Sequence, residues 1–277
     1  MGRPYAEVIG DPVAHSRSPM IHKAWLADLG IDGDYGAARI FPSQLADYLA
    51  GRRADPDWRG CNVTLPHKQA VLPLLDHVDP NARRIGAVNC VYRGAQGLHG
   101  CNSDVGGVAA ALDCVDMKGE KATLIGAGGA ARAALDYLAG REVDRIALLV
   151  RDPVKAEDLR STVAGARVEL WPMDRCDGAM SGARLLINAS PMGMVGAPAM
   201  PPSLLACVAA HAPGTTLFDM VYNPLETDLL AAGRANGAAV VDGLAMLIGQ
   251  ARAAFQLFFG RPPPEDAEAR IRALLTT

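Results

Sequence analysis

The chain has 277 residues and a formal net charge of −3 at pH 7; half of its residues are apolar and 21% are charged. This composition supplies a large apolar core, and at about 100–200 residues per domain the length predicts two domains. The charge balance and the lack of long Lys/Arg runs argue against nucleic acid or a membrane surface as partner.

The start of the sequence and its cysteines indicate a cytoplasmic protein. The first residues contain no apolar segment typical of a secretory signal. No two of the six cysteines form a CxxC pair and the six histidines lack ligand-like spacing, so we expect reduced thiols and no metal site. The most apolar stretch, 238–259, contains Asp242, Gln250 and Arg252, and we interpret it as a core helix rather than a membrane span.

Near the N-terminus, a short apolar strand leads into a polar loop and a predicted helix. Ser18 followed by Pro19 is typical of a helix start, with serine at the N-cap. Ser16 and Ser18 also place two hydroxyl groups beside the helix N-terminus, where an anion such as a carboxylate is favoured. The pattern therefore predicts either a carboxylate site or simple capping by Ser18.

Two charged residues of the first hundred or so positions stand at predicted helix starts. Lys68 follows Pro66 in a first turn, where the helix dipole opposes a cation. It is either an exposed lysine or one used in general acid–base chemistry. Asp104 precedes two glycines and a helix, so it either caps that helix or orients a lysine and shares its proton. Asn89 interrupts an apolar strand between these two positions.

Beyond residue 120, apolar strands alternate with helical patterns, which predicts βαβ units and a parallel sheet. The pattern of the last 35 residues predicts two more helices, which either extend the second domain or return to the first. The expected strands are 122–125, 146–150, 185–187 and 217–221, and the expected helices include 130–139 and 154–163.

The first of these strands runs into a G-x-G-x-x-A turn, the strand–turn–helix context of a dinucleotide site. Gly126 permits the tight turn, and Gly128 lets a pyrophosphate approach the backbone at the helix N-terminus. Ala131 keeps the helix close to the sheet. A glycine-rich turn without a ligand is the alternative. The residues of the turn are Gly126, Ala127, Gly128, Gly129 and Ala130.

Arg151 and Asp152 follow the next strand, at the position that contacts the cofactor ribose. A carboxylate there accepts hydrogen bonds from the 2′-hydroxyl of NAD, whereas a guanidinium pairs with the 2′-phosphate of NADP. Two charged residues capping a strand are a further alternative. We expect Asp152 to turn away and cap a helix that begins at Pro153, which leaves Arg151 for NADP.

Taken together, eight motifs in order make the chain resemble the shikimate/quinate dehydrogenase family over nearly its whole length. They are Gly-x-Pro-x-x-His-Ser-x-Ser-Pro-x-x-His at 10–22, Asn-Val-Thr-x-Pro-x-Lys at 62–68, Gly-Ala-Val-Asn at 86–89, Asn-Ser-Asp-x-x-Gly at 102–107, Gly-Ala-Gly-Gly-Ala-x-Arg at 126–132, Ile-Asn-Ala-Ser-Pro-x-Gly-Met at 187–194, Asp-x-Val-Tyr-Asn-Pro at 219–224 and Gly-x-x-Met-Leu-x-x-Gln at 243–250.

The resemblance implies an α/β fold with a discontinuous substrate domain, 1–103 completed by 242–277, and a Rossmann-type NADP-binding domain with a parallel sheet, 104–241. It implies that Lys68 and Asp104 are the catalytic acid–base pair. The implied substrate-binding residues are Ser16, Ser18, Thr64, Lys68, Asn89, Asp104, Tyr222 and Gln250. The implied cofactor-binding residues, beyond the glycine turn and Arg151, are Asn188, Ser190, Met220 and Gly243.

The implied activity is the reversible, NADPH-dependent reduction of 3-dehydroshikimate to shikimate in aromatic amino-acid biosynthesis, by a monomer or homodimer. An NAD-dependent quinate or quinate/shikimate dehydrogenase is the alternative, because Asp152 stands where the family usually has threonine. Serine at both 16 and 18 favours shikimate over quinate. A nucleotide-binding regulatory protein without turnover is a distant alternative, which the intact Lys68 and Asp104 disfavour.

Overall fold

The computed structural model describes residues 2–160 and 167–276. The chain forms two compact α/β units. The first combines Met1–Gly106 with Ile248–Thr277, and the second is Gly107–Leu247. The first unit is therefore discontinuous in sequence. The divisions fall within two helices, α5 (Asp104–Leu112) and α10 (Gly243–Phe259), near the predicted limits at 103 and 242.

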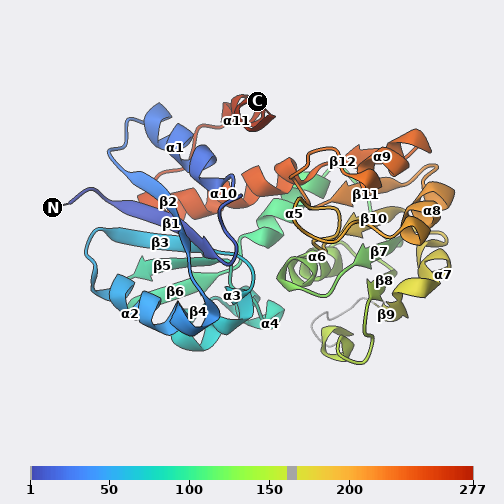
Figure 1. Cartoon of the computed structure of the whole chain (residues 1–277), viewed down its shortest axis with the longest axis horizontal. Helices are drawn as coiled ribbons and strands as arrows, with labels where there is room; N and C mark the ends of the chain where they lie inside the picture. Colours follow the sequence, from blue (N-terminus) through green and yellow to red (C-terminus); the bar gives the residue numbers. More distant parts are fainter. Residues whose placement is uncertain (1, 161–166, 277) are drawn as a thin grey trace. The chain divides into compact units, whose positions relative to one another are not determined.

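The first unit is built on a mixed six-stranded sheet. Its strands lie in the order β2 (Asp34–Arg39), β1 (Tyr5–Gly10), β3 (Trp58–Val63), β5 (Cys90–Gly94), β6 (Gly97–Cys101) and β4 (His77–Val78) (Figure 1). Strand β1 is parallel to both β2 and β3, whereas β5 is antiparallel to β3 and β6. Because β1 and β3 run the same way, the loops that follow them leave the sheet at one edge.

Helices cover both faces of this sheet. Side chains alternate along β1, so that Ile9 packs with Leu49 of α2 while Val8 packs with Phe258 of α10 on the other face. The helices and 3₁₀ turns of this unit, apart from α5 and α10, are α1 (Ser18–Asp28), η1 (Pro42–Gln44), α2 (Leu45–Ala54), α3 (His67–Ala70), η2 (Leu72–Leu74), α4 (Pro80–Ile85) and α11 (Ala267–Thr276).

Aromatic packing places the C-terminal part of α10 in the core of the first unit. Phe255 packs edge-to-face on Trp25 of α1, with ring centroids 5.6 Å apart. His22, also on α1, is fully buried and stacks on Tyr35 at 3.9 Å. Burial lowers the pKa of His22 to about 3, so this histidine is a neutral core residue. The chain thus returns to complete the first unit.

The second unit is built on a six-stranded sheet in which all neighbouring strands are parallel. The order is β12 (Ala239–Val241), β11 (Thr216–Asp219), β10 (Leu185–Asn188), β7 (Lys121–Ile125), β8 (Arg145–Val150) and β9 (Arg167–Pro172). The chain proceeds from β7 to β9 in one direction and then crosses back to β10. The boundary between β7 and β10 is therefore the switch point where such sheets bind dinucleotides.

Helices lie on both sides of this second sheet. Figure 1 shows α6 on one side and α7, α8 and α9 on the other. On the latter side, Leu186 of β10 packs in one buried cluster with Leu204 of α8 and Leu229 of α9. The helices and 3₁₀ turns of this unit are α6 (Gly129–Ala139), η3 (Glu157–Arg160), η4 (Met173–Arg175), α7 (Cys176–Met180), α8 (Pro202–His211) and α9 (Asp228–Ala235).

The structure confirms the α/β class and the parallel sheet but corrects several local predictions. The helix predicted at 154–163 is wrong: a turn leads into η3, and 161–163 lie outside the described residues. The strand predicted at 217–221 ends at Asp219, whose carboxylate accepts a hydrogen bond from the N–H of Val221 and ends the ladder. Helix α1 begins at Ser18 with Arg17 as the cap residue, so Ser18 is not the N-cap.

The apolar stretch 238–259 is also not a single helix. It begins with β12 and continues as α10, after Asp242 accepts a hydrogen bond from the N–H of Leu244. Within the described ranges, no helix combines the length and apolarity needed to span a membrane.

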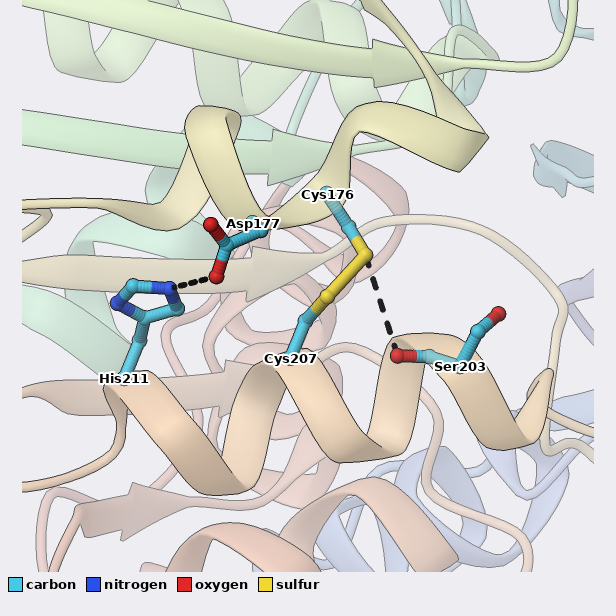
Figure 2. Close-up of a disulfide and its surroundings, with 5 residues drawn as sticks. All are labelled: Cys176, Asp177, Ser203, Cys207 and His211. Atoms are coloured by element: carbon cyan, nitrogen blue, oxygen red, sulfur yellow. Dashed lines mark hydrogen bonds and ion pairs between the residues drawn. A yellow bond between two sulfur atoms is a disulfide. The ribbon is translucent and has the colours of Figure 1, made fainter.

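The expectation that all six cysteines are reduced is wrong for two of them. Figure 2 shows a disulfide between Cys176, the first residue of α7, and Cys207 on α8. Their Cα atoms are 6.2 Å apart, within the usual disulfide range. Beside the disulfide, His211 Nε2 lies 3.0 Å from Asp177 Oδ1. The packing of α7 on α8 creates this proximity, and a spacing of 31 residues gave no sign of it. The free thiols are Cys61, Cys90, Cys101 and Cys114.

Candidate active site

Lys68 and Asp104, which are 36 residues apart in sequence, meet in the first unit. Lys68 Nζ donates a hydrogen bond to Asp104 Oδ2 over 2.5 Å. The Lys68 side chain is 15% exposed and the Asp104 side chain 6%, so the ion pair is largely shielded from water. The carboxylate also compensates a cation that the dipole at the start of α3 opposes. The pair places a proton donor and an acceptor in direct contact, as acid–base chemistry requires.

Polar neighbours fix the position of Asp104. Asn89 Nδ2 donates to Asp104 Oδ1 over 2.7 Å, and Asn102 Oδ1 accepts the backbone N–H of Asp104 over 3.0 Å. Asn89 Oδ1 also accepts the N–H of Ser103, whose hydroxyl donates to Gln250 Oε1 over 3.4 Å. The structure thus gathers four of the predicted substrate residues, Lys68 included, into one buried polar cluster.

The loops after β1 and β3 carry the remaining predicted substrate residues of the first unit. A Cβ atom on Gly10 would lie 2.9 Å from the carbonyl oxygen of Leu65, so glycine lets the two loops approach closely. Ser16 Oγ accepts the backbone N–H of Ser18 over 3.3 Å. Ser18 is buried, whereas Ser16 and Thr64 are half-buried. The two serines therefore share a sheet edge with Thr64 and the Lys68 helix.

The glycine turn of the second unit has the geometry expected of a phosphate site. Gly126 has a φ of +116°, and a Cβ there would lie 3.1 Å from the backbone of Ala189. Gly128 faces open space, with no atom within 4 Å of a built Cβ, and as the cap residue of α6 it has no side chain that could accept the N–H groups of the first turn. Ala131 is fully buried. The N–H groups at the start of α6 are therefore available to an anion.

Arg151 and Asp152 follow β8 at the same edge of the sheet. Arg151 is exposed. Asp152 Oδ1 accepts the backbone N–H groups of Val154 and Lys155 over 3.1 and 3.3 Å, and its second oxygen lies 3.5 Å from Lys155 Nζ. Asp152 thus caps the backbone after Pro153, but the prediction of a helix beginning at Pro153 is wrong, because the capped segment is a turn.

The other predicted cofactor residues lie at the carboxyl ends of β10 and β11, except Gly243, which follows β12 and begins α10. The Asn188 side chain is fully buried, and its Oδ1 accepts both the N–H and the hydroxyl of Ser190 over 3.0 and 2.7 Å. Met220 N–H donates to the carbonyl of Asn188 over 3.0 Å. A Cβ on Gly243 would lie 2.6 Å from the Met220 carbonyl oxygen. Tyr222 is half-buried and belongs to this unit, unlike the other predicted substrate residues.

Comparison with known proteins shows the family of this chain. Three family models match: "Shikimate dehydrogenase substrate binding domain" at 8–91, "Shikimate / quinate 5-dehydrogenase" at 109–193 and "Shikimate 5'-dehydrogenase C-terminal domain" at 243–267. A shikimate dehydrogenase (NADP(+)) of Sphingopyxis alaskensis is 47% identical over 98% of this chain and 97% of its own length. The chain belongs to the shikimate dehydrogenase family.

Solved structures of this family resemble the chain over both units. A shikimate dehydrogenase in complex with NADP⁺ has a TM-score of 0.87 at 32% identity, covering 99% of this chain and 96% of its own. The Listeria monocytogenes shikimate 5-dehydrogenase in complex with shikimate and NAD has a TM-score of 0.86 at 29% identity, covering 98% and 96%.

Two residues of the sites had no role assigned from sequence. Asn102 caps the start of α5 and fixes the backbone of Asp104, and Asp219 lies buried beside Asn188. Both belong to the family motifs, at 102–107 and 219–224. Their position could have indicated these roles, because a short polar side chain directly before a helix or at the end of an apolar strand commonly accepts backbone N–H groups.

Proposed function

We propose that this enzyme reduces 3-dehydroshikimate to shikimate with NADPH and catalyses the reverse reaction with NADP⁺. The observation that carries the proposal is the shielded Lys68–Asp104 pair, with Nζ and Oδ2 2.5 Å apart. It is supported by the name of the 47% identical relative, a shikimate dehydrogenase (NADP(+)).

The substrate binds at the sheet edge that the loops after β1 and β3 share. The hydroxyl groups of Ser16 and Ser18 donate hydrogen bonds to its carboxylate. They lie next to the N-terminus of the 11-residue helix α1, whose dipole favours an anion. Asn89 and Gln250, together with Thr64, contact the ring hydroxyls. Tyr222, which belongs to the second unit, is the remaining proposed substrate residue.

The residues of the second unit fit a dinucleotide phosphate group. The open space at Gly128 and the free start of α6 accept the pyrophosphate. The exposed Arg151 guanidinium pairs with a 2′-phosphate, because Asp152 is engaged by its own backbone. The other predicted cofactor residues lie along the rest of the cofactor; they are Asn188, Ser190, Met220 and Gly243. When bound, NADPH supplies the hydride for the reduction.

Lys68 delivers a proton to the oxygen of the carbonyl group whose carbon accepts the hydride. Its ammonium group carries three protons. One forms the hydrogen bond to Asp104, and another is available for the substrate. Asp104, held by Asn89 and Asn102, keeps Nζ in a fixed position, and this positioning lowers the entropic part of the barrier. Water can restore the lost proton, because the Lys68 side chain is 15% exposed.

Identification of the product tests the proposed reaction. The purified enzyme is incubated with 3-dehydroshikimate and NADPH, and the consumption of NADPH and the formation of shikimate are followed by absorbance and NMR. We expect one shikimate formed for each NADPH consumed. NADPH oxidation without shikimate, or no oxidation at all, contradicts the proposal.

We also infer that the enzyme works in the cytoplasm as a monomer or a homodimer. The free thiols of Cys61, Cys90, Cys101 and Cys114 are typical of a reducing compartment, although Cys176 and Cys207 are paired. Sedimentation equilibrium distinguishes one or two chains from a larger assembly, which would contradict the inference.

A further inference from the structure

One buried carboxylate joins three segments of the second unit. Asp219 ends β11 and is paired in register with Asn188, which ends β10. Asp219 Oδ1 accepts hydrogen bonds from Asn188 Nδ2 over 2.9 Å and from the N–H of Val221 over 3.0 Å. Its Oδ2 accepts the hydroxyl of Thr227 over 2.7 Å. These hydrogen bonds connect the end of β10, the loop after β11 and the start of α9. Asp219 itself is fully buried.

All three of these partners act as donors to Asp219. The amide nitrogen of Asn188 and the backbone N–H of Val221 can only donate. Thr227 Oγ1 already accepts the N–H of Leu230 as the N-cap of α9, which directs the hydroxyl proton to Asp219. Burial raises the pKa of the Asp219 carboxyl, and the three hydrogen bonds oppose that rise by stabilising the ionised form.

The segments held by Asp219 border the glycine turn. Asn188, fixed by Asp219, in turn accepts two hydrogen bonds from Ser190. Between them, the N–H of Ala189 donates to the carbonyl of Ile125 over 2.9 Å, and the Ala189 backbone packs on Gly126. Strands β7 and β10 flank the switch point of the sheet, so this loop forms one wall of the phosphate site.

We propose that Asp219 is a positioning residue for the dinucleotide, which fixes the loops after β10 and β11 through Asn188 and Thr227. Because Asp219 is fully buried, it acts through these loops and not by contact with the cofactor. The inference rests on the proposed function in one respect, namely that the second unit binds NADP.

The substitution Asp219→Asn tests this role because it keeps the shape of the side chain and removes one acceptor oxygen. Whichever way the new amide is turned, its NH₂ group faces a donor: either Thr227 or the pair formed by Asn188 and the Val221 N–H. In the first case the Thr227 hydroxyl can no longer donate to residue 219, and in the second the hydrogen bonds from Asn188 and the Val221 N–H are lost. Either change weakens the hold on the loops.

The measurements are the Kd of NADP⁺ by titration calorimetry, the KM of shikimate, kcat at saturating NADP⁺ and the melting temperature. We expect Asp219→Asn to raise the Kd of NADP⁺ about tenfold, equal to about 1.4 kcal/mol, with kcat within about twofold of wild type. The shikimate KM should rise less than the Kd of NADP⁺, because Tyr222 is the one proposed substrate residue on the loop after β11. Thr227→Val should also raise the Kd, whereas Thr227→Ser, which retains the hydroxyl, should restore it.

A matched control loses one buried hydrogen bond at the opposite end of the same strand. Thr215, directly before β11, donates its hydroxyl to the carbonyl of Ala212 over 2.8 Å. Thr215→Val should lower the melting temperature and leave the Kd of NADP⁺ unchanged. This variant separates a general loss of stability from a specific loss of positioning.

Each outcome has one meaning. A wild-type Kd in Asp219→Asn overturns the positioning role, as does a rise that Thr215→Val reproduces. If Asp219→Asn does not fold, the Kd values of Thr227→Val and Thr227→Ser decide: equal values overturn the role. A wild-type enzyme that binds no NADP⁺ instead overturns the proposed function itself.

Discussion

Replacing Lys68 by methionine removes the proton donor and keeps most of the side-chain volume. A general acid contributes about 10²–10⁴-fold to the rate, so we expect kcat to fall by that factor. Asp104 also loses a donor, and we expect a stability loss of about 1–3 kcal/mol. This is less than the about 3–5 kcal/mol for breaking a fully buried ion pair, because Asn89 still donates to Asp104 Oδ1 and the Lys68 side chain is 15% exposed.

The assay follows the reduction of dehydroshikimate and compares kcat, the substrate KM and the melting temperature for Lys68→Met, Asp104→Asn and the double variant. The substrate KM should change much less than kcat, because the lost interaction is used mainly in the transition state. The two single losses should not add, since the residues act as one unit. A kcat for Lys68→Met within about threefold of wild type, or fully additive losses, would refute the reasoning.

Three further predictions concern the proposed contacts with substrate and cofactor. Ser16→Ala and Ser18→Ala should each lower kcat/KM for shikimate about tenfold or more and leave the KM of NADP⁺ unchanged. If a variant loses affinity for shikimate and for NADP⁺ equally, the substitution has damaged α1 instead. Arg151→Ala should lower kcat/KM with NADP⁺ about 10–100-fold, or about 1.4–2.7 kcal/mol, without changing NAD⁺ kinetics; a parallel loss with NAD⁺ would exclude the 2′-phosphate role. Gly243→Ala places a methyl group 2.6 Å from the Met220 carbonyl oxygen, so the melting temperature should fall and the Kd of NADP⁺ should rise. Wild-type values in both measurements would show that the start of α10 shifts without cost.

The parts of the fold that the sequence predicted are those with strong local signals. The strand ending at Ile125, the turn at Gly126 and the helix over 129–139 follow one another, so apolar runs and glycine spacing suffice to place them. Taken alone, Lys68 could equally be an exposed surface lysine, and Asp104 could simply cap a helix. Their pairing at 2.5 Å joins residues 36 positions apart. The residues alone left it as one of two alternatives, and the order of the family motifs favoured it.

The features that the sequence did not predict depend on tertiary packing. The Cys176–Cys207 disulfide forms because α7 packs on α8, which no local pattern reports. The helix expected at 154–163 is replaced by a turn and a short 3₁₀ segment over the described residues, although Asp152 accepts the N–H groups of Val154 and Lys155 as a helix N-cap would. A favourable cap is therefore not sufficient to predict that a helix follows.

The most direct test of the account is a comparison of kcat/KM for shikimate and quinate, each with NADP⁺ and with NAD⁺. The paired serines at 16 and 18 and the exposed Arg151, with Asp152 turned to its own backbone, predict that shikimate with NADP⁺ gives the highest value. Replacing NADP⁺ by NAD⁺ should lower kcat/KM by about tenfold or more. A higher value with quinate, or with NAD⁺, would contradict the account.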